Sequence, residues 1–196
     1  MHKIRWICIT FTFLLLTGCV GGATLPLVEN DYKFPKKEKE GVIFLSVDAL
    51  GTDASSIVLL IYPHNKQDKK DELRVIAVPN KDGTWRHSRN TGGNDSQNII
   101  ITSLPPGKYD MRSWTMFIGN RYLYPKQVTD SFIFTVKEGN ANYIGNLVIR
   151  INHDNTKSST NVYNKNERDI PLFKQDMPAF NAGKIRQSLM IKVPFY

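Results

Sequence analysis

The stretch Leu104-Pro105-Pro106-Gly107-Lys108-Tyr109 decides the fold class of this 196-residue chain. Its two consecutive prolines end the hydrogen-bonded ladder of a preceding strand, because proline has no backbone N–H group. Gly107 suits a turn conformation that other residues resist, and Tyr109 starts the next strand with a large, partly polar side chain. The stretch therefore predicts a turn between two β-strands.

Short runs of β-branched and aromatic residues recur on both sides of this turn. Residues 131–136 and 149–151 alternate partly between apolar and polar, which places one face of a strand in a core and the other in water. Asp82-Gly83 and Glu138-Gly139-Asn140 mark turns between the runs. We predict strands near residues 42–48, 57–62, 73–79, 98–103, 108–118, 131–137, 143–151 and 189–193. The fold class is then mainly β: a single antiparallel β-sandwich with a short irregular or helical C-terminal segment.

The turn and a second segment, Asn142-Tyr143-Ile144-Gly145-Asn146-Leu147, together resemble a known pattern. The L-P-P-G-x-Y turn is similar to the one in prealbumin-like and carboxypeptidase-regulatory-like β-sandwiches. Followed by a Y-I-G strand, it resembles bacterial lipoprotein families built on domains of unknown function. The resemblance spans roughly residues 41–151, and it implies a prealbumin- or immunoglobulin-like sandwich with no catalytic residue.

After Ile151 the chain becomes polar, and we predict a loop over residues 152–161. Asp169 is expected to cap a short helix that has Pro171 in its first turn and ends before Pro178. Residues 182–188 are expected to form a further turn of helix before a closing edge strand. The segment 152–188 would then cover an open end or edge of the sandwich.

The N-terminus has the anatomy of a secretory signal, with a basic start followed by an apolar run at residues 6–16. As a helix this run reaches roughly 16 Å, well short of the roughly 30 Å of a bilayer's hydrocarbon. Leu16-Thr17-Gly18-Cys19 resembles a bacterial lipobox, and the alternative is an ordinary secretory signal with an accidental Gly-Cys pair. The lipobox resemblance implies cleavage after residue 18 and lipid on Cys19.

In lipoproteins of this kind the cysteine receives a thioether-linked diacylglycerol, and its new α-amine is usually acylated with a chain such as palmitate, which anchors the protein durably. Val20 replaces the aspartate that commonly retains such proteins in the inner membrane. We therefore expect a cell-envelope protein, attached to the outer membrane and facing the periplasm or the surface if the cell is Gram-negative.

Residues 19–40 are predicted to be a flexible tether, and residues 41–196 a single domain. The lysines of the tether suggest contact with an anionic membrane, but acids nearly balance them, so we prefer a plain linker. Removing Lys3 and Arg5 with the signal lowers the formal charge from +8 to +6. No dense basic block or nucleic-acid-binding signature is present, so a solvated surface is expected and nucleic acid is not an expected partner.

Few residues of the mature chain are candidates for chemistry. Cys8 leaves with the signal and Cys19 carries lipid, so no thiol or intramolecular disulfide is expected. No G-x-S-x-G, H-E-x-x-H or Gly-rich phosphate motif occurs. His64, His87 and His153 lie in predicted loops without zinc-site spacing, and we expect no catalytic residue, no metal and no cofactor besides the lipid.

Aromatic and arginine side chains are the better candidates, because they are favoured at interfaces. Trp85, Arg86 and Arg89 flank a Gly/Asn-rich loop and are the predicted ligand contacts. Tyr122 and Tyr124 could extend that surface, whereas Trp114 lies inside a predicted strand and belongs to the core.

Three functions remain open from the sequence. The first is a non-enzymatic, lipid-anchored module that presents loops or a sheet edge to another envelope protein. The second is a carbohydrate- or peptidoglycan-binding module that uses the Trp85 loop. The third and weakest is an envelope hydrolase that uses His87, His153 and Asp154, which requires these side chains to share a cleft.

Overall fold

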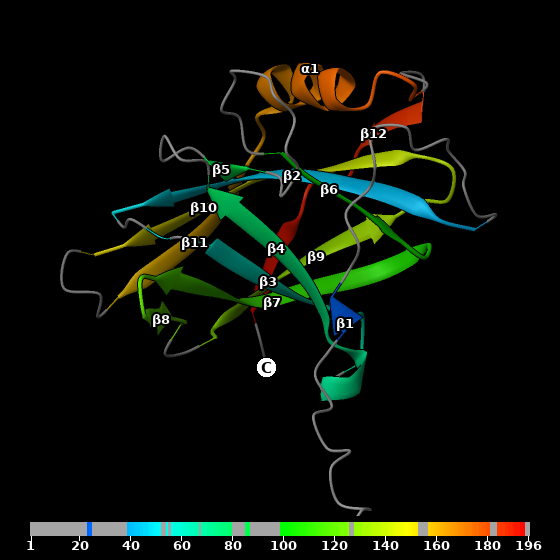
Figure 1. Cartoon of the computed structure of the whole chain (residues 1–196). Helices are drawn as coiled ribbons and strands as arrows, with labels where there is room; N and C mark the ends of the chain where they lie inside the picture. Colours follow the sequence, from blue (N-terminus) through cyan, green and yellow to red (C-terminus); the bar gives the residue numbers. More distant parts are fainter. Residues whose placement is uncertain are drawn as a thin grey trace, which may run out of the picture.

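The computed structural model describes residues 23–24, 39–51, 54, 56–66, 68–79, 85–86, 99–125, 128–152, 157–180 and 184–194. Two β-sheets pack face to face, and one α-helix lies on the outer face of one of them (Figure 1). The predicted mainly-β sandwich is therefore confirmed. Cys19 and the predicted lipobox lie outside the described residues.

The larger sheet has eight strands, in the order β1-β4-β3-β7-β9-β13, with β5 paired to β4 and β8 paired to β7. These strands are β1 (Ala23–Thr24), β3 (Ser56–Pro63), β4 (Leu73–Pro79), β5 (Trp85–Arg86), β7 (Gly107–Ile118), β8 (Arg121–Leu123), β9 (Asp130–Val136) and β13 (Ile191–Pro194). A short 3-10 helix, η1 (Lys69–Asp71), precedes β4.

The smaller sheet has five strands, in the order β11-β10-β2-β6, with β12 also paired to β10. Its strands are β2 (Gly41–Leu50), β6 (Ile99–Leu104), β10 (Ala141–Ile151), β11 (Ser158–Tyr163) and β12 (Ile185–Gln187). The helix α1 (Asn166–Asp176) follows β11. All eight predicted strands are present, and the last of them, β13, forms an edge of the larger sheet as expected.

The Leu104–Tyr109 stretch makes a corner between the two sheets. β6 ends at Leu104 in the smaller sheet and β7 begins at Gly107 in the larger one. Tyr109 is buried, stacks on Phe134 with ring centroids 5.7 Å apart, and donates a 2.8 Å hydrogen bond to the carbonyl oxygen of Pro105. The tyrosine therefore ties the corner to the core.

The core between the sheets follows strand alternation. Ile57, Leu59 and Ile61 of β3 face it, as do Ile43, Leu45 and Val47 of β2. The predicted turn at Glu138-Gly139-Asn140 is confirmed, and Gly139 takes a φ of 69° there, which favours glycine. The predicted Asp82-Gly83 turn lies outside the described residues.

The antiparallel part of the prediction is wrong for the central pair of the smaller sheet. β2 and β10 run parallel over Val42–Leu50, and β12 also pairs parallel with β10. Alternation predicts which face of a strand is buried but not the direction of its neighbour, so the sequence pattern had no information on this point.

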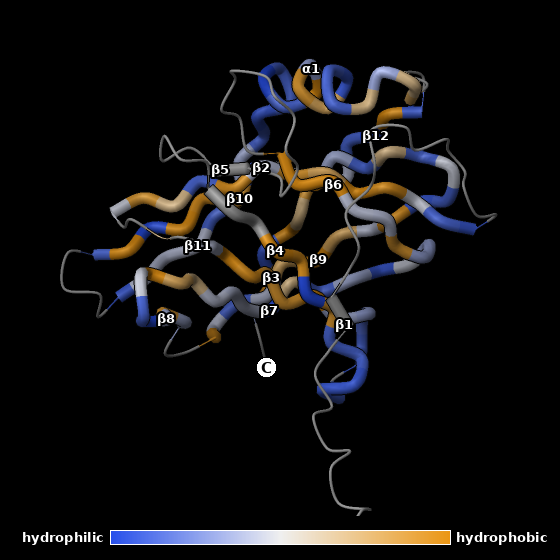
Figure 2. The backbone as a smooth tube through the Cα atoms, in the orientation of Figure 1, coloured by the Kyte–Doolittle hydropathy of each residue, from blue (hydrophilic) through white to orange (hydrophobic). Residues whose placement is uncertain are grey.

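The helix α1 covers the outer face of the smaller sheet and not, as predicted, an open end or edge (Figures 1 and 2). Phe173 stacks on Phe44 with centroids 4.2 Å apart and meets Phe180 edge-on at 5.3 Å. These rings form a second core with the outward-facing side chains of β2, β6 and β10. Figure 2 shows the rest of α1 as largely hydrophilic.

Three local predictions in the C-terminal segment are corrected. The predicted loop over 152–161 contains the start of β11 at Ser158, and the predicted helical turn over 182–188 contains β12. Asp169 is not the cap of α1: the helix starts at Asn166 after Lys165, and Pro171 lies in its second turn. Asp169 instead points into the sheet and is fully buried.

Candidate functional site

A cleft of about 170 Å³ opens on the side of the sandwich where β11 and β13 are the end strands of their sheets. Larger pockets of about 300–1,000 Å³ are usual for drug-sized ligands, so this cleft suits a single side chain or a comparably small group. Its lining combines the core residues Met111, Trp114 and Phe132 with hydroxyl groups of β11. The other lining residues are Arg112, Ser113, Pro125, Val128, Thr129, Asp130 and Lys192.

The cleft exists because β11 turns small polar side chains toward the sandwich interior. Ser158 is opposite Ile151 and Thr160 is opposite Ile149, and both isoleucines belong to the core. Directly paired residues share a face of the sheet, so Ser158 and Thr160 also face inward. Trp114 donates a 3.0 Å hydrogen bond from Nε1 to Oγ1 of Thr160 across the gap between the sheets.

An ion pair lies at the rim of the cleft. Lys192 Nζ is 3.0 Å from Asp130 Oδ2, and the hydrogen bond from Lys192 holds the pKa of Asp130 below its usual range. Both side chains are partly exposed, so the pair contributes little to stability but presents both charge signs to an incoming group.

Arg112 connects the cleft to a charged cluster on the larger sheet. It is the extra residue of a β-bulge, because Leu60 pairs with Ser113 and Ile61 pairs with Met111. Its Nη2 donates a 3.1 Å hydrogen bond to Asp110, and its guanidinium lies 4.6 Å from the ring centroid of Tyr62. Asp110 also forms a 2.7 Å hydrogen bond through Oδ1 with Nδ1 of His64.

The cluster continues through Tyr62, which donates a 2.5 Å hydrogen bond to Glu72. Burial, aided by that carboxylate, raises the pKa of Tyr62 to about 12. Burial also acts to raise the pKa of Glu72, but hydrogen bonds from Tyr62 and Arg74 outweigh it and the pKa falls below its usual value. Asp110 and Glu72 are thus each hydrogen-bonded to an arginine, and Glu72 also to a phenol. Such pairing is typical of a structural ion network.

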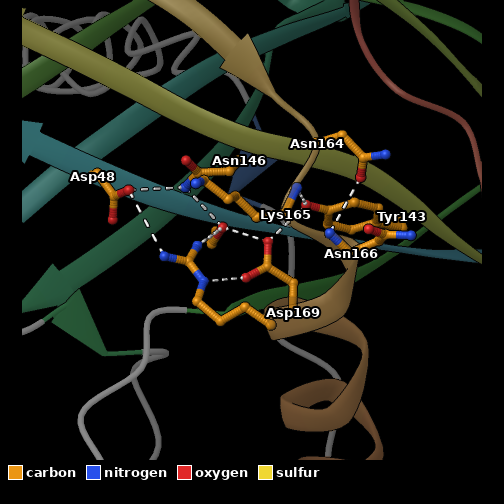
Figure 3. Close-up of polar contacts among 9 residues, drawn as sticks. Asp48, Tyr143, Asn146, Asn164, Lys165, Asn166 and Asp169 are labelled. Carbon is orange, nitrogen blue, oxygen red and sulfur yellow. Dashed lines mark hydrogen bonds and ion pairs between the residues drawn. The ribbon is translucent and has the colours of Figure 1, made fainter.

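A second polar network pins α1 to the smaller sheet (Figure 3). Asp169 Oδ2 accepts 2.7 Å hydrogen bonds from Ser46 and from the hydroxyl of Tyr143, and its Oδ1 accepts one from Arg168 Nε. Asn146 donates to Ser46 and to Asp48. Burial and Asp169 together raise the pKa of the Tyr143 hydroxyl, so it stays protonated as a donor.

The structure describes few of the residues predicted to bind a ligand. Trp85 and Arg86 form the two-residue strand β5 against β4, but their side chains are outside the description, and Arg89, His87, His153 and Asp154 are outside it altogether. The predicted Trp85 surface and the predicted histidine cleft therefore stay predictions.

Three other aromatic residues considered from the sequence are placed by the structure. Trp114 is 2% exposed, as expected for a core residue, whereas Tyr122 and Tyr124 are 64% and 58% exposed and stack with centroids 6.0 Å apart.

Sequence reasoning missed the cleft and both networks. β11 has only Val162 as an aliphatic residue, so no apolar run marked it as a strand. His64 and Asp110 are 46 residues apart and meet only because β3 and β7 pair. One signal was available: Thr160 in the predicted loop over 152–161, and Val162 and Tyr163 directly after it, are strand-favouring residues.

Within the described ranges, no group of three His, Cys, Asp or Glu residues could hold a metal ion, and no helix is long and apolar enough to cross a membrane.

The fold and the cleft define a β-sandwich protein with one helix-covered face and one open side. No protein-family model and no curated protein matches this chain. A solved structure described as a "putative cell adhesion protein" from Parabacteroides distasonis ATCC 8503 is similar over 65% of this chain, with 11% identity and a TM-score of 0.33. The similarity covers 38% of that protein, so this chain spans about two fifths of it.

Proposed function

We propose that this protein is a lipid-anchored, non-enzymatic module of the cell envelope that binds an extended segment of another envelope protein along β11. The observation that carries the proposal is that β11, an end strand of the smaller sheet, has nothing in its sequence that would block pairing with a further strand. β11 reads Ser-Ser-Thr-Asn-Val-Tyr, and among the described strands it pairs only with β10. Lysine, proline or a bulge usually blocks such an edge, and β11 has none of these.

The other end strand on the same side is protected in the usual way. β13 contains Lys192 and ends in Pro194, which lacks a donor for a further strand. The contrast between the two edges favours β11 as the place where a partner adds a strand.

The backbone of β11 offers its hydrogen-bonding groups at every second residue. The N–H of Asn152 donates to the carbonyl of Lys157 at 3.1 Å, which makes 152 and 157 a hydrogen-bonded pair. Such pairs alternate along an antiparallel ladder, so the N–H and C=O groups of Ser158, Thr160 and Val162 point away from β10. An incoming strand would bond to these three residues.

The cleft gives the added strand a place for one side chain. Strand addition gains affinity from main-chain hydrogen bonds and specificity from pockets for alternate side chains. Here the pocket lies beside Ser158 and Thr160, has Trp114 and Phe132 in its lining, and carries the Asp130–Lys192 pair at its rim. It suits a side chain that has both an apolar part and a polar end.

One substitution separates strand addition from other modes of binding. Thr160→Pro removes an N–H group that faces the free edge and leaves the ladder to β10 intact, whereas Thr160→Val keeps that N–H and removes only the hydroxyl that Trp114 contacts. Both variants are made in the mature chain with Cys19→Ala, which keeps it free of lipid. A library of displayed 12-residue peptides is selected on the unsubstituted chain.

We expect selected peptides to bind the chain and the Thr160→Val variant and to lose at least tenfold in affinity for Thr160→Pro. Amide exchange at Ser158, Thr160 and Val162 should slow when peptide is bound. Peptides that bind Thr160→Pro equally well, or a failure to select any, would contradict the proposal.

A glycan is the second candidate, because Tyr122 and Tyr124 form an exposed stacked pair next to Pro125 of the cleft. Sugar rings pack on such surfaces through their apolar faces. Binding of peptidoglycan fragments that is lost in Tyr122→Ala and kept in Thr160→Pro would favour this candidate instead.

A further inference from the structure

The strand β1 fixes where the proposed lipid anchor meets the domain. Ala23 pairs with Leu73 and Thr24 with Arg74, so this part of the predicted tether lies against the edge of the larger sheet. Cys19 precedes Ala23 by four residues, and four residues span at most about 14 Å. A lipid on Cys19 would therefore hold β1, and β4 beside it, close to the membrane surface.

The turn between β3 and β4 is the part of the domain next to this point. Leu73, the partner of Ala23, directly follows η1 and Glu72. In Figure 1, η1 is the short blue-green helix beside β1, on the side of the molecule opposite α1. Whatever side chains this turn exposes would face the headgroups.

The exposed side chains of the turn are mainly basic. Lys66, Lys69 and Lys70 are exposed, and Lys108 is close because its carbonyl accepts a 2.8 Å hydrogen bond from the N–H of His64. The acids beside them are Asp68 and Asp71. The ion pair between Lys70 and Asp68 has both side chains about 70% exposed, so it leaves the lysine available to other anions.

On the opposite side of the molecule, α1 itself has no excess of bases. Apart from the buried Asp169, two acids (Glu167 and Asp176) accompany two bases (Arg168 and Lys174). The open side with β11 is also far from the anchor, because β1 and β13 are at opposite ends of the larger sheet. The attachment of β1 and the exposed lysines of the β3–β4 turn thus select the same side to face an anionic surface.

We propose that the β3–β4 turn docks on the anionic phosphate headgroups of the leaflet that holds the lipid of Cys19, so that α1 and the β11 edge face away from the membrane. This orientation rests on the lipid anchor of the proposed function. Each lysine near an anionic surface contributes about a fivefold gain in partitioning. The short link to Cys19 raises the local concentration of headgroups, so a few lysines suffice.

Single labelling sites are available because Cys19 carries lipid in this proposal and Cys8 leaves with the signal. The lipidated chain is made with either Lys69→Cys or Lys174→Cys, each labelled with an environment-sensitive fluorophore. Both changes replace an exposed lysine. Lys69→Cys also removes one charge of the proposed contact, so any quenching of its label understates the contact that the unsubstituted chain makes. The proteins are placed in vesicles of phosphatidylcholine with about one third phosphatidylglycerol and a headgroup-linked quencher.

We expect the label at 69 to be quenched at least threefold more than the label at 174. The difference should shrink at least twofold in 0.5 M salt, in vesicles of phosphatidylcholine alone, or when Lys66→Gln and Lys70→Gln are added. Equal quenching at the two sites would overturn the orientation. A quenching difference that stays the same in 0.5 M salt and after the lysines are removed would overturn the contact with phosphate.

The test separates this inference from the proposed function. A purified chain without the mass of a diacylglycerol, and absent from the membrane fraction, would remove the anchor and the orientation with it. A lipidated chain with equal quenching would overturn the orientation alone and leave strand addition at β11 to its own test.

Discussion

Removing the carboxylate of Asp169 should release α1 from the smaller sheet. Asp169 is fully buried and accepts hydrogen bonds from Ser46, Tyr143 and Arg168. The Asp169→Ala variant leaves the buried Tyr143 hydroxyl without this acceptor, although it keeps the bond that Tyr143 accepts from the N–H of Lys165. Ser46 keeps its bonds from Asn146 and Arg168.

The expected loss of stability follows from these partners. A buried polar group left without its partner costs about 1–3 kcal/mol, and breaking a buried ion pair about 3–5 kcal/mol. The side chain of Arg168 is 38% exposed and also lies 3.9 Å from Asp48, so solvent and that second carboxylate reduce its share. We therefore expect a loss of about 2–4 kcal/mol for Asp169→Ala and about 1–2 kcal/mol for Asp169→Asn, which keeps the shape and one acceptor.

Urea unfolding of the lipid-free mature chain measures this loss. With a slope of about 2 kcal/mol per molar urea, the midpoint of Asp169→Ala should fall by about 1–2 M. Glu167→Gln, on the exposed side of the same helix turn, is the control and should stay within about 0.5 kcal/mol of the unsubstituted chain. An Asp169→Ala midpoint equal to that of the control would refute the role of this network in holding α1.

Three further predictions concern the corner, β11 and acid stability. Tyr109→Phe should lose about 1 kcal/mol in urea unfolding, because the bond to Pro105 goes, while exposed Tyr122→Phe should not change stability. Gly145→Ala should lower the free energy of unfolding by about 1–3 kcal/mol and speed amide exchange in β11, because φ at Gly145 is 109° and an added Cβ would lie 2.7 Å from Val162 Cγ1. Unchanged amide exchange in β11 would contradict this reasoning. The lowered pKa of Glu72 means that its contribution to stability is present above about pH 4.5 and is lost as pH falls through its lower folded pKa. Glu72→Gln should therefore be less stable than the unsubstituted chain at pH 6 and equally stable near pH 2, and a gap that persists at pH 2 would count against this cause.

Strand positions could be predicted from the sequence because most strands face the core with alternate large apolar residues. The limits of the prediction have physical causes. The direction of β10 beside β2 depends on how distant segments pair, which alternation along one strand does not record. β11 was not predicted because two of its three inward positions are the small polar residues Ser158 and Thr160, and these same residues create the cleft. The feature that hides the strand from sequence reasoning is thus the feature that makes the candidate site.

The position of α1 could have been inferred from a signal in β2 and β6. A strand with one wet face alternates, but Val42-Ile43-Phe44-Leu45 and Ile99-Ile100-Ile101 are continuously apolar, and such runs indicate strands covered on both faces. The element that covers the second face must come from elsewhere in the chain, and α1 is the amphipathic segment that supplies Phe173.

Apolar contact alone allows a helix to slide over a sheet, because it has no preferred direction. Ser46 on β2, Tyr143 on β10 and Asp169 on α1 meet at one point within hydrogen-bond distance. Any shift of α1 would break bonds that have no replacement in a buried site. The polar network therefore sets the register of the helix, and the apolar face supplies most of its attachment.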